Sequence, residues 1–198
     1  MKKFSELSEC LFIFLLFLSG CANRPPTVQE PAARTQATQP SAITTPKLEI
    51  LNQQIQSNPE NAQAYSNRGY TLAIMGQRDQ ARADLKKAVA LKSTAPMHNG
   101  AGWSYFNLGD YQDALQEWKI AADMSNRRSH YDYYSLALGY WGVGDWKNCL
   151  ENYQLAVERE PKFGEAKLLQ ERTAEWTPLE KRAIQEIYAR WSKAWRNS

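Results

Sequence analysis

The side chains that most often carry chemistry are few in this sequence and lie far apart. Its histidines are His98 and His130, and neither has a second metal-ligating residue three or four positions away. A zinc site on a helix needs two such ligands on one face. We therefore predict no metal site and no cofactor.

A glycine-rich stretch, Gly139-x-x-Gly142-x-Gly144, has the composition of a phosphate-binding loop but not its setting. Such a loop joins a strand to a helix, whereas this stretch ends a predicted helix. The Gly-x-Ser-x-Gly, Walker and His-Glu-x-x-His motifs are missing from the sequence. We predict that the protein is not an enzyme, with no catalytic residues and no small-molecule substrate.

Lipidation is the one chemistry that the sequence indicates, at Cys21. Lys2 and Lys3 precede an eight-residue apolar run over residues 11–18, and Leu18-Ser19-Gly20-Cys21 follows. A membrane-spanning helix is the alternative, but it needs about 20 apolar residues. The order resembles the bacterial lipobox, which implies cleavage after residue 20 and acylation of Cys21. Cleavage also removes Cys10, so Cys149 remains as the one thiol and no intramolecular disulfide forms.

The same resemblance implies a location. Enterobacterial lipoproteins with Asp after the acylated cysteine are retained in the inner membrane, and Ala22 stands there instead. We expect a lipid anchor in the outer membrane, facing the periplasm. The linker that follows is rich in Pro, Thr, Gln, Ala and Ser, and it lacks apolar periodicity, so we predict that it is disordered. Its average reach is about 25–30 Å.

Four sets of residues recur further along the chain at spacings of 33 and 35 positions. They are Gly76, Gly109 and Gly144; Ala81, Ala114 and Cys149; Leu85, Trp118 and Tyr153; and Ala88, Ala121 and Ala156. The small residues let two helices approach closely, and the large ones fill the space beside them. Period and pattern resemble the tetratricopeptide repeat, a helix-turn-helix of about 34 residues. The resemblance implies an all-α fold, a short helical solenoid.

These patterns divide the chain into segments. A signal peptide over 1–20 precedes the lipidated cysteine and linker over 21–46, a repeat domain over 47–174 and an amphipathic C-terminal capping helix over 175–198. The repeats cover about 62–94, 95–128 and 130–163. Helix pairs are expected near 62–75 with 78–91, 95–107 with 111–123, and 130–142 with 146–158. Residues 47–57 form the second helix of a partial leading repeat, and 164–174 a single following helix.

Turn and cap residues support this division. In Gly109-Asp110 and Gly144-Asp145, the glycine suits a left-handed position after a helix and the aspartate suits the cap of the next one. Thr177-Pro178-Leu179-Glu180 has the residues of a capping box. The helix after it places Ile184, Ile187, Tyr188, Trp191 and Trp195 on one face.

Several residues with reactive or charged side chains occupy structural positions of the repeat, so we predict a structural and not a catalytic role for them. Cys149 is a possible nucleophile, but it stands in a small-residue set, so we predict a buried, inert thiol. His98 falls at a packing position, and His130 opens a helix, where a solvated role is expected. Arg68 and His98 occupy positions at which the repeat family prefers apolar residues.

In tetratricopeptide-repeat proteins the first helix of each pair lines a concave surface. Carried over position by position, the resemblance selects Gln63, Ser66 and Pro96 among others, and predicts these partner-binding residues: Tyr70, Trp103, Phe106, Tyr131, Tyr134, Leu138 and Trp141. The set is neutral and aromatic, which suits a partner helix or an apolar peptide and not an acidic tail. The alternative is that the last helix, 178–195, folds back and covers this groove.

We therefore expect a lipid-anchored envelope adaptor that binds one or more other envelope proteins. Similar proteins serve pilus secretins, peptidoglycan enzymes and outer-membrane assembly. The net charge is +3 and the repeats show no basic face, so nucleic acid is not an expected partner. The alternative function is that of a peripheral membrane-surface protein with a covered groove. It rests on the basic, Trp-rich last helix, with Lys181, Arg182, Arg190, Lys193 and Arg196 beside Trp191 and Trp195.

Overall fold

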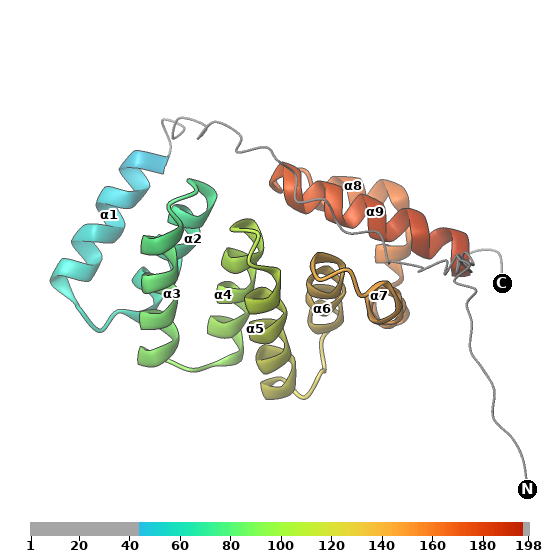
Figure 1. Ribbon diagram of the computed structural model, residues 1–198, viewed down its shortest axis with the longest axis horizontal. Coiled ribbons are helices and arrows are strands. Elements are labelled where there is room, and N and C mark those ends of the chain that lie inside the picture. Colours follow the sequence, from blue (N-terminus) through green and yellow to red (C-terminus); the bar gives the residue numbers. More distant parts are fainter. Residues whose placement is uncertain (1–43, 196–198) are drawn as a thin grey trace, which may run out of the picture. The chain divides into compact units, whose positions relative to one another are not determined.

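The computed structural model describes residues 44–195, so the predicted signal peptide, Cys21 and linker lie outside the described part. A first helix, α1 (Thr44–Ser57), precedes three helix pairs (Figure 1). The pairs are α2 (Ala62–Ile74) with α3 (Arg78–Leu91), α4 (Ala95–Asn107) with α5 (Tyr111–Met124), and α6 (His130–Gly142) with α7 (Trp146–Arg159). A 3-10 turn, η1 (Pro161–Gly164), then leads to α8 (Ala166–Arg172) and α9 (Pro178–Trp195).

The described residues contain helices and no strand, which confirms the all-α prediction. The six helices of the three pairs begin and end within one residue of the expected positions. Two ends differ. The leading helix starts earlier than expected, at Thr44, and the helix after the repeats is split into η1 and α8. Glu165 separates the two, and η1 is held to α7 by Phe163, whose side chain is buried and whose carbonyl accepts a hydrogen bond from the Tyr153 hydroxyl at 2.7 Å.

The turn within each pair is the predicted glycine turn. Gly76, Gly109 and Gly144 have φ angles of 72°, 77° and 80°, in the left-handed region that glycine reaches without steric cost. The aspartates that follow differ. Asp145 caps α7 by accepting a hydrogen bond from the Asn148 N–H at 3.1 Å. Asp110 makes no cap, because its carboxylate binds Arg78 and Arg82 of the preceding repeat.

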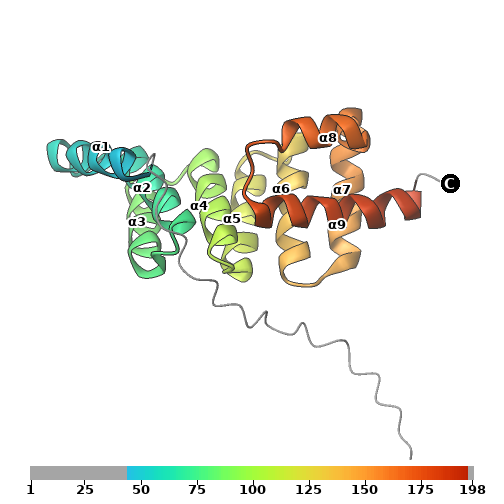
Figure 2. The ribbon, with the colours of Figure 1, turned by 90° about the horizontal axis from the view of Figure 1, so that it is seen from above.

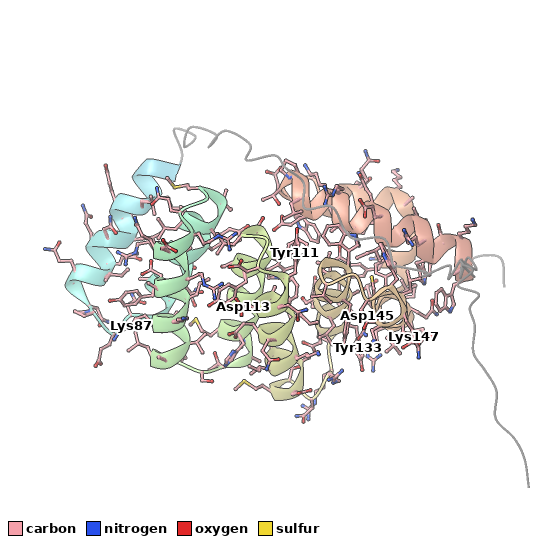
Figure 3. The ribbon with its side chains drawn as sticks, in the orientation of Figure 1. Lys87, Tyr111, Asp113, Tyr133, Asp145 and Lys147 are labelled. Atoms are coloured by element: carbon pink, nitrogen blue, oxygen red, sulfur yellow. The ribbon has the colours of Figure 1, made fainter. Side chains whose placement is uncertain are left out.

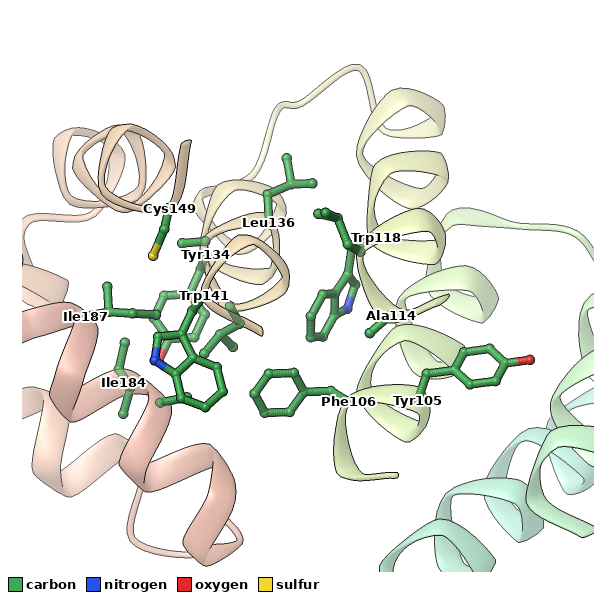
Figure 4. Close-up of a cluster of buried hydrophobic side chains, with 14 of the residues drawn as sticks. Tyr105, Phe106, Ala114, Trp118, Tyr134, Leu136, Trp141, Cys149, Ile184 and Ile187 are labelled. Carbon is green, nitrogen blue, oxygen red and sulfur yellow. The ribbon is translucent and has the colours of Figure 1, made fainter. Parts of the chain in front are cut away.

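The recurring small and large residues form the core between the two helices of each pair, as predicted. Ala81, Ala114 and Cys149 are fully buried, and so are the large residues one turn further on. A glycine on the facing helix makes this approach possible. A Cβ built on Gly102 would lie 2.5 Å from Nε1 of Trp118. Figure 4 shows the Trp118 ring of α5 close to the Phe106 ring of α4.

Two polar side chains of this core form hydrogen-bonded pairs. Arg68 donates two hydrogen bonds of 2.7 Å to the carboxylate of Asp84, whose side chain is buried. His98 is also buried, with Nδ1 2.6 Å from a Glu117 oxygen and Nε2 2.9 Å from the Ser93 hydroxyl. The second helix of the same repeat supplies the acid in both pairs, so a polar side chain replaces the usual apolar contact at those positions.

The last helix, α9, packs against α6 and α7 (Figure 2). Ile184, Ile187 and Trp191 are its buried face. The predicted capping box is present, since the Thr177 N–H donates to Glu180 at 2.8 Å and the Glu180 N–H donates to the Thr177 hydroxyl at 3.3 Å. Glu180 also accepts a hydrogen bond from the Asn107 amide at 2.8 Å, which ties the start of α9 to the end of α4.

Candidate functional site

The first helices α2, α4 and α6 line one face of the repeats, and α8 and α9 lie over part of it (Figures 1 and 2). The structure therefore divides the seven predicted partner-binding residues into two groups. Tyr70 and Trp103 are half-buried and Tyr131 is 59% exposed. The other four are buried: Phe106, Tyr134, Leu138 and Trp141.

The prediction that these four residues face a partner is wrong in this arrangement. Ile184 and Ile187 of α9 lie beside Trp141 and Tyr134 (Figure 4). The Trp141 Nε1–H donates a hydrogen bond of 2.9 Å to Glu186. Covering a large apolar surface is favourable in water, and α9 supplies the apolar face that does so. The alternative prediction was that the last helix covers the groove. It holds for the C-terminal half of the groove, which α6 lines.

Between the covered and the open parts lies Trp176, a residue that the sequence analysis did not select. Its ring meets Trp103 edge-on at 5.3 Å between centroids and Tyr134 at 5.8 Å. Trp176 lies in the connection between α8 and α9, outside the repeats, so no recurring position pointed to it. A large aromatic residue just before a capping box was the only signal available.

The open part is a groove across α2 and α4, and we name it the open half. It encloses about 380 Å³. Five of the positions that the family geometry selects line it: Gln63, Ser66, Tyr70, Pro96 and Trp103. Lys47 of α1 contributes to one wall, and Glu175, Trp176 and Glu180 contribute to the other.

The open half has aromatic walls, amide groups and little net charge. Gln63 donates a hydrogen bond of 2.9 Å to Asn67, and both side chains are exposed to solvent. Burial and the nearby Glu180 carboxylate raise the pKa of Tyr70, so its hydroxyl stays a neutral donor at physiological pH. The charged residues of the lining are Lys47, Glu175 and Glu180, one positive and two negative. Such a lining suits van der Waals contact and amide hydrogen bonds with a polypeptide.

A second cavity of about 340 Å³ continues from Trp103 and Trp176 toward α6 and α8. Aromatic rings form most of its lining, including Tyr131, Tyr134 and Phe163, and Leu169 and Thr173 of the α8 segment close it. Tyr131 therefore lines this second cavity and not the open half.

The other residues with possible chemistry have structural surroundings. Cys149 is fully buried, and burial raises the pKa of its thiol to about 12, so the thiol stays protonated and inert. His130 is half-buried, with its ring 5.2 Å from that of Phe163, which corrects the expected solvated role. Within residues 44–195, no three His, Cys, Asp or Glu side chains come together as metal ligands would.

The basic face of α9 is less suited to a membrane surface than its sequence indicates. Trp191 is buried, and its Nε1–H donates to Gln154 at 2.7 Å. The Arg190 guanidinium lies 3.8 Å from the ring centre of Trp146. Trp195, by contrast, is 37% exposed. None of the helices in the described part is both long and apolar enough to span a membrane.

Comparison with known proteins agrees with this geometry. The tetratricopeptide repeat family model matches residues 60–128. No curated protein matches the chain. Among solved structures, a thermophilic tetratricopeptide-repeat protein of Thermus thermophilus is 22% identical, with a TM-score of 0.54, over 67% of this chain and 72% of that one.

Two further structures extend the likeness over more of the chain. MamA of Desulfovibrio magneticus is 17% identical with a TM-score of 0.54, over 78% of this chain and 88% of that one. PilF of Pseudomonas aeruginosa is 16% identical with a TM-score of 0.53, over 75% and 71%. At these identities the likeness is one of fold. The chain therefore carries tetratricopeptide repeats, matched as a family over residues 60–128, within an all-α solenoid of the tetratricopeptide-repeat fold.

Proposed function

We propose that this protein is a lipid-anchored adaptor of the bacterial cell envelope that binds another protein through the open half. The observation that carries the proposal is the groove of about 380 Å³ between Tyr70, Trp103 and Trp176, which no helix of the described chain covers. Repeats of this family are scaffolds for protein–protein interaction, and their concave face is the usual site.

The chemistry of the open half favours a polypeptide partner. Tyrosine and tryptophan are the residue types that most often dominate binding energy, because they bring large contact area at low entropic cost. Gln63 and Asn67 offer both donors and acceptors to a peptide backbone. The lining carries little net charge, which argues against nucleic acid and against a strongly acidic or basic peptide tail as the partner.

The anchor is the part of the proposal that rests on sequence alone. The lipobox-like Leu18-Ser19-Gly20-Cys21 supports acylation of Cys21, and Ala22 supports sorting to the outer membrane. A tether of linker length leaves the repeats free to meet a periplasmic partner. PilF is one of the proteins that share the fold, so a pilus-related assembly is one of several in which to look for the partner.

Labelling with a radioactive or clickable fatty acid tests the anchor. Wild-type protein should incorporate the label and fractionate with the outer membrane. Cys21→Ser should do neither, because it lacks the thiol that accepts the acyl chain. Cys149→Ser is the matched control, because it removes a cysteine that is buried in the repeats. Equal labelling of Cys21→Ser and wild type would refute the anchor.

Photo-crosslinking in intact cells tests the open half. A photoreactive amino acid placed at Gln63, which is exposed and lines the groove, should yield one dominant protein adduct. The control is Lys87 on α3, which is exposed and lies outside the groove (Figure 3). Adducts of equal yield from both positions, or none from Gln63, would contradict binding through the open half.

The membrane-surface alternative retains one supporting observation, the exposed Trp195 next to Lys193. Unlipidated Cys21→Ser protein should therefore be mixed with anionic vesicles and floated on a density gradient. Flotation that is lost in Trp195→Ala would favour that alternative over the adaptor.

A further inference from the structure

The segment between the third repeat and α9 presents one apolar face. Leu169 lies in α8, Thr173 directly follows the last residue of that helix, and Trp176 lies in the connection to α9. Leu169 and Thr173 are buried, and Trp176 is half-buried. Most other side chains described in this segment are exposed. The segment over 165–176, which we name the strap, is therefore a short amphipathic helix followed by an aromatic residue.

The strap occupies the middle of the concave face, where a partner helix would bind. Trp176 inserts between Trp103 of α4 and Tyr134 of α6, at ring distances of 5.3 and 5.8 Å. Leu169 and Thr173 close the aromatic cavity beside it. An apolar groove that takes up an aliphatic and an aromatic side chain is also the kind of surface that recognises amphipathic helices.

Cavities border the strap on two sides. The aromatic cavity of about 340 Å³ is lined by residues of the strap and of α6, and another of about 520 Å³ lies between α8 and α9. Leu169 and Thr173 line both cavities. Both cavities are partly open to the surface, so the strap has fewer neighbouring side chains there than an element packed on all sides. In contrast, α9 is fixed by side-chain hydrogen bonds to α4, α6 and α7.

We propose that the strap is an internal ligand of the concave face, and that the partner is a short amphipathic helix that displaces it. This inference rests on the proposed function and names its partner class. The partner carries a large aliphatic residue at one position and an aromatic residue seven positions later, as Leu169 and Trp176 do. With the strap displaced, the open half and the aromatic cavity join at Trp103, since that residue lines both.

A synthetic peptide with the sequence of residues 165–177 tests this inference. The labelled peptide is titrated into full-chain protein in detergent, and binding is followed by fluorescence anisotropy. In wild type the tethered strap competes for the same site and keeps binding weak. Trp176→Ala weakens the competitor. An aromatic anchor contributes about 2 kcal/mol, so peptide affinity should rise about thirtyfold. Trp195→Ala, on an exposed tryptophan outside the site, should leave affinity unchanged.

Two results would overturn the inference. One is that Trp176→Ala binds the peptide no more tightly than Trp195→Ala does. The other is that a peptide with alanine at both anchors binds as tightly as the native one. Melting curves check that each variant is folded, and if Trp176→Ala is not, Leu169→Ala is judged by the same criteria. The crosslinks from Gln63 do not involve this peptide, so its failure would leave the proposed function standing.

Discussion

Replacing Trp141 by alanine separates a buried core residue from a partner-binding residue. Trp141 is largely buried, packs 5.9 Å from the rings of Phe106 and Tyr111, and donates a hydrogen bond to Glu186. A large-to-small change at such a site costs about 3–5 kcal/mol. For a domain of this size each kcal/mol shifts the melting temperature by about 2–4 °C. We therefore expect Trp141→Ala to melt about 6–20 °C below wild type.

The assay is thermal melting followed by far-ultraviolet circular dichroism, with Tyr131→Ala as the control. Tyr131 is 59% exposed, so its replacement should change the free energy of unfolding by no more than about 0.5 kcal/mol. Partner capture by Trp141→Ala should persist at temperatures where the variant is folded. A wild-type melting temperature together with lost capture would refute the placement of Trp141 beneath α9.

Three other substitutions test the packing of the repeats. Gly102→Ala should destabilise the protein by about 1–3 kcal/mol in urea denaturation, since its Cβ would lie 2.5 Å from Nε1 of Trp118; a neutral effect would contradict that contact. Arg68→Ala should cost about 1.5–3 kcal/mol because it strips the buried Asp84 carboxylate of two charge-assisted hydrogen bonds, and a cost near zero would contradict it. The raised pKa of Cys149, about 12, means that the unfolded chain loses the thiol proton first. Between about pH 9 and 12, the unfolding free energy of wild type should therefore fall relative to Cys149→Ala by up to about 1.4 kcal/mol per pH unit, and equal pH profiles would disprove this.

The repeats were predictable because each position is constrained several times over. A glycine at the turn, a small residue opposite a large one and a fixed period all specify the same helix pair. That agreement placed the six paired helices to within a residue and identified Cys149 as a core residue. Capping boxes are equally local, which is why the start of α9 was found from Thr177 to Glu180.

The sequence left open whether the groove is covered, because the answer depends on where a segment outside the repeats packs. The amphipathic face of α9 fits a partner, a membrane or its own repeats equally well in sequence. Long-range contacts decide which of these surfaces α9 packs against, and examples are the hydrogen bonds of Trp141 with Glu186 and of Trp191 with Gln154. The role of Asp110 was missed for the same reason, since it binds arginines of the preceding repeat instead of capping its own helix.

The affinity of the partner for Tyr70→Ala tests the central claim most directly. The partner identified through Gln63 is purified and titrated calorimetrically into wild type, Tyr70→Ala and Lys87→Ala. If the open half is the binding site, Tyr70→Ala should lower affinity about thirtyfold, the loss expected for an aromatic hot spot of about 2 kcal/mol. Lys87→Ala should bind as wild type does. Wild-type affinity in Tyr70→Ala, with a folded protein, would show that the partner binds elsewhere and would contradict the account.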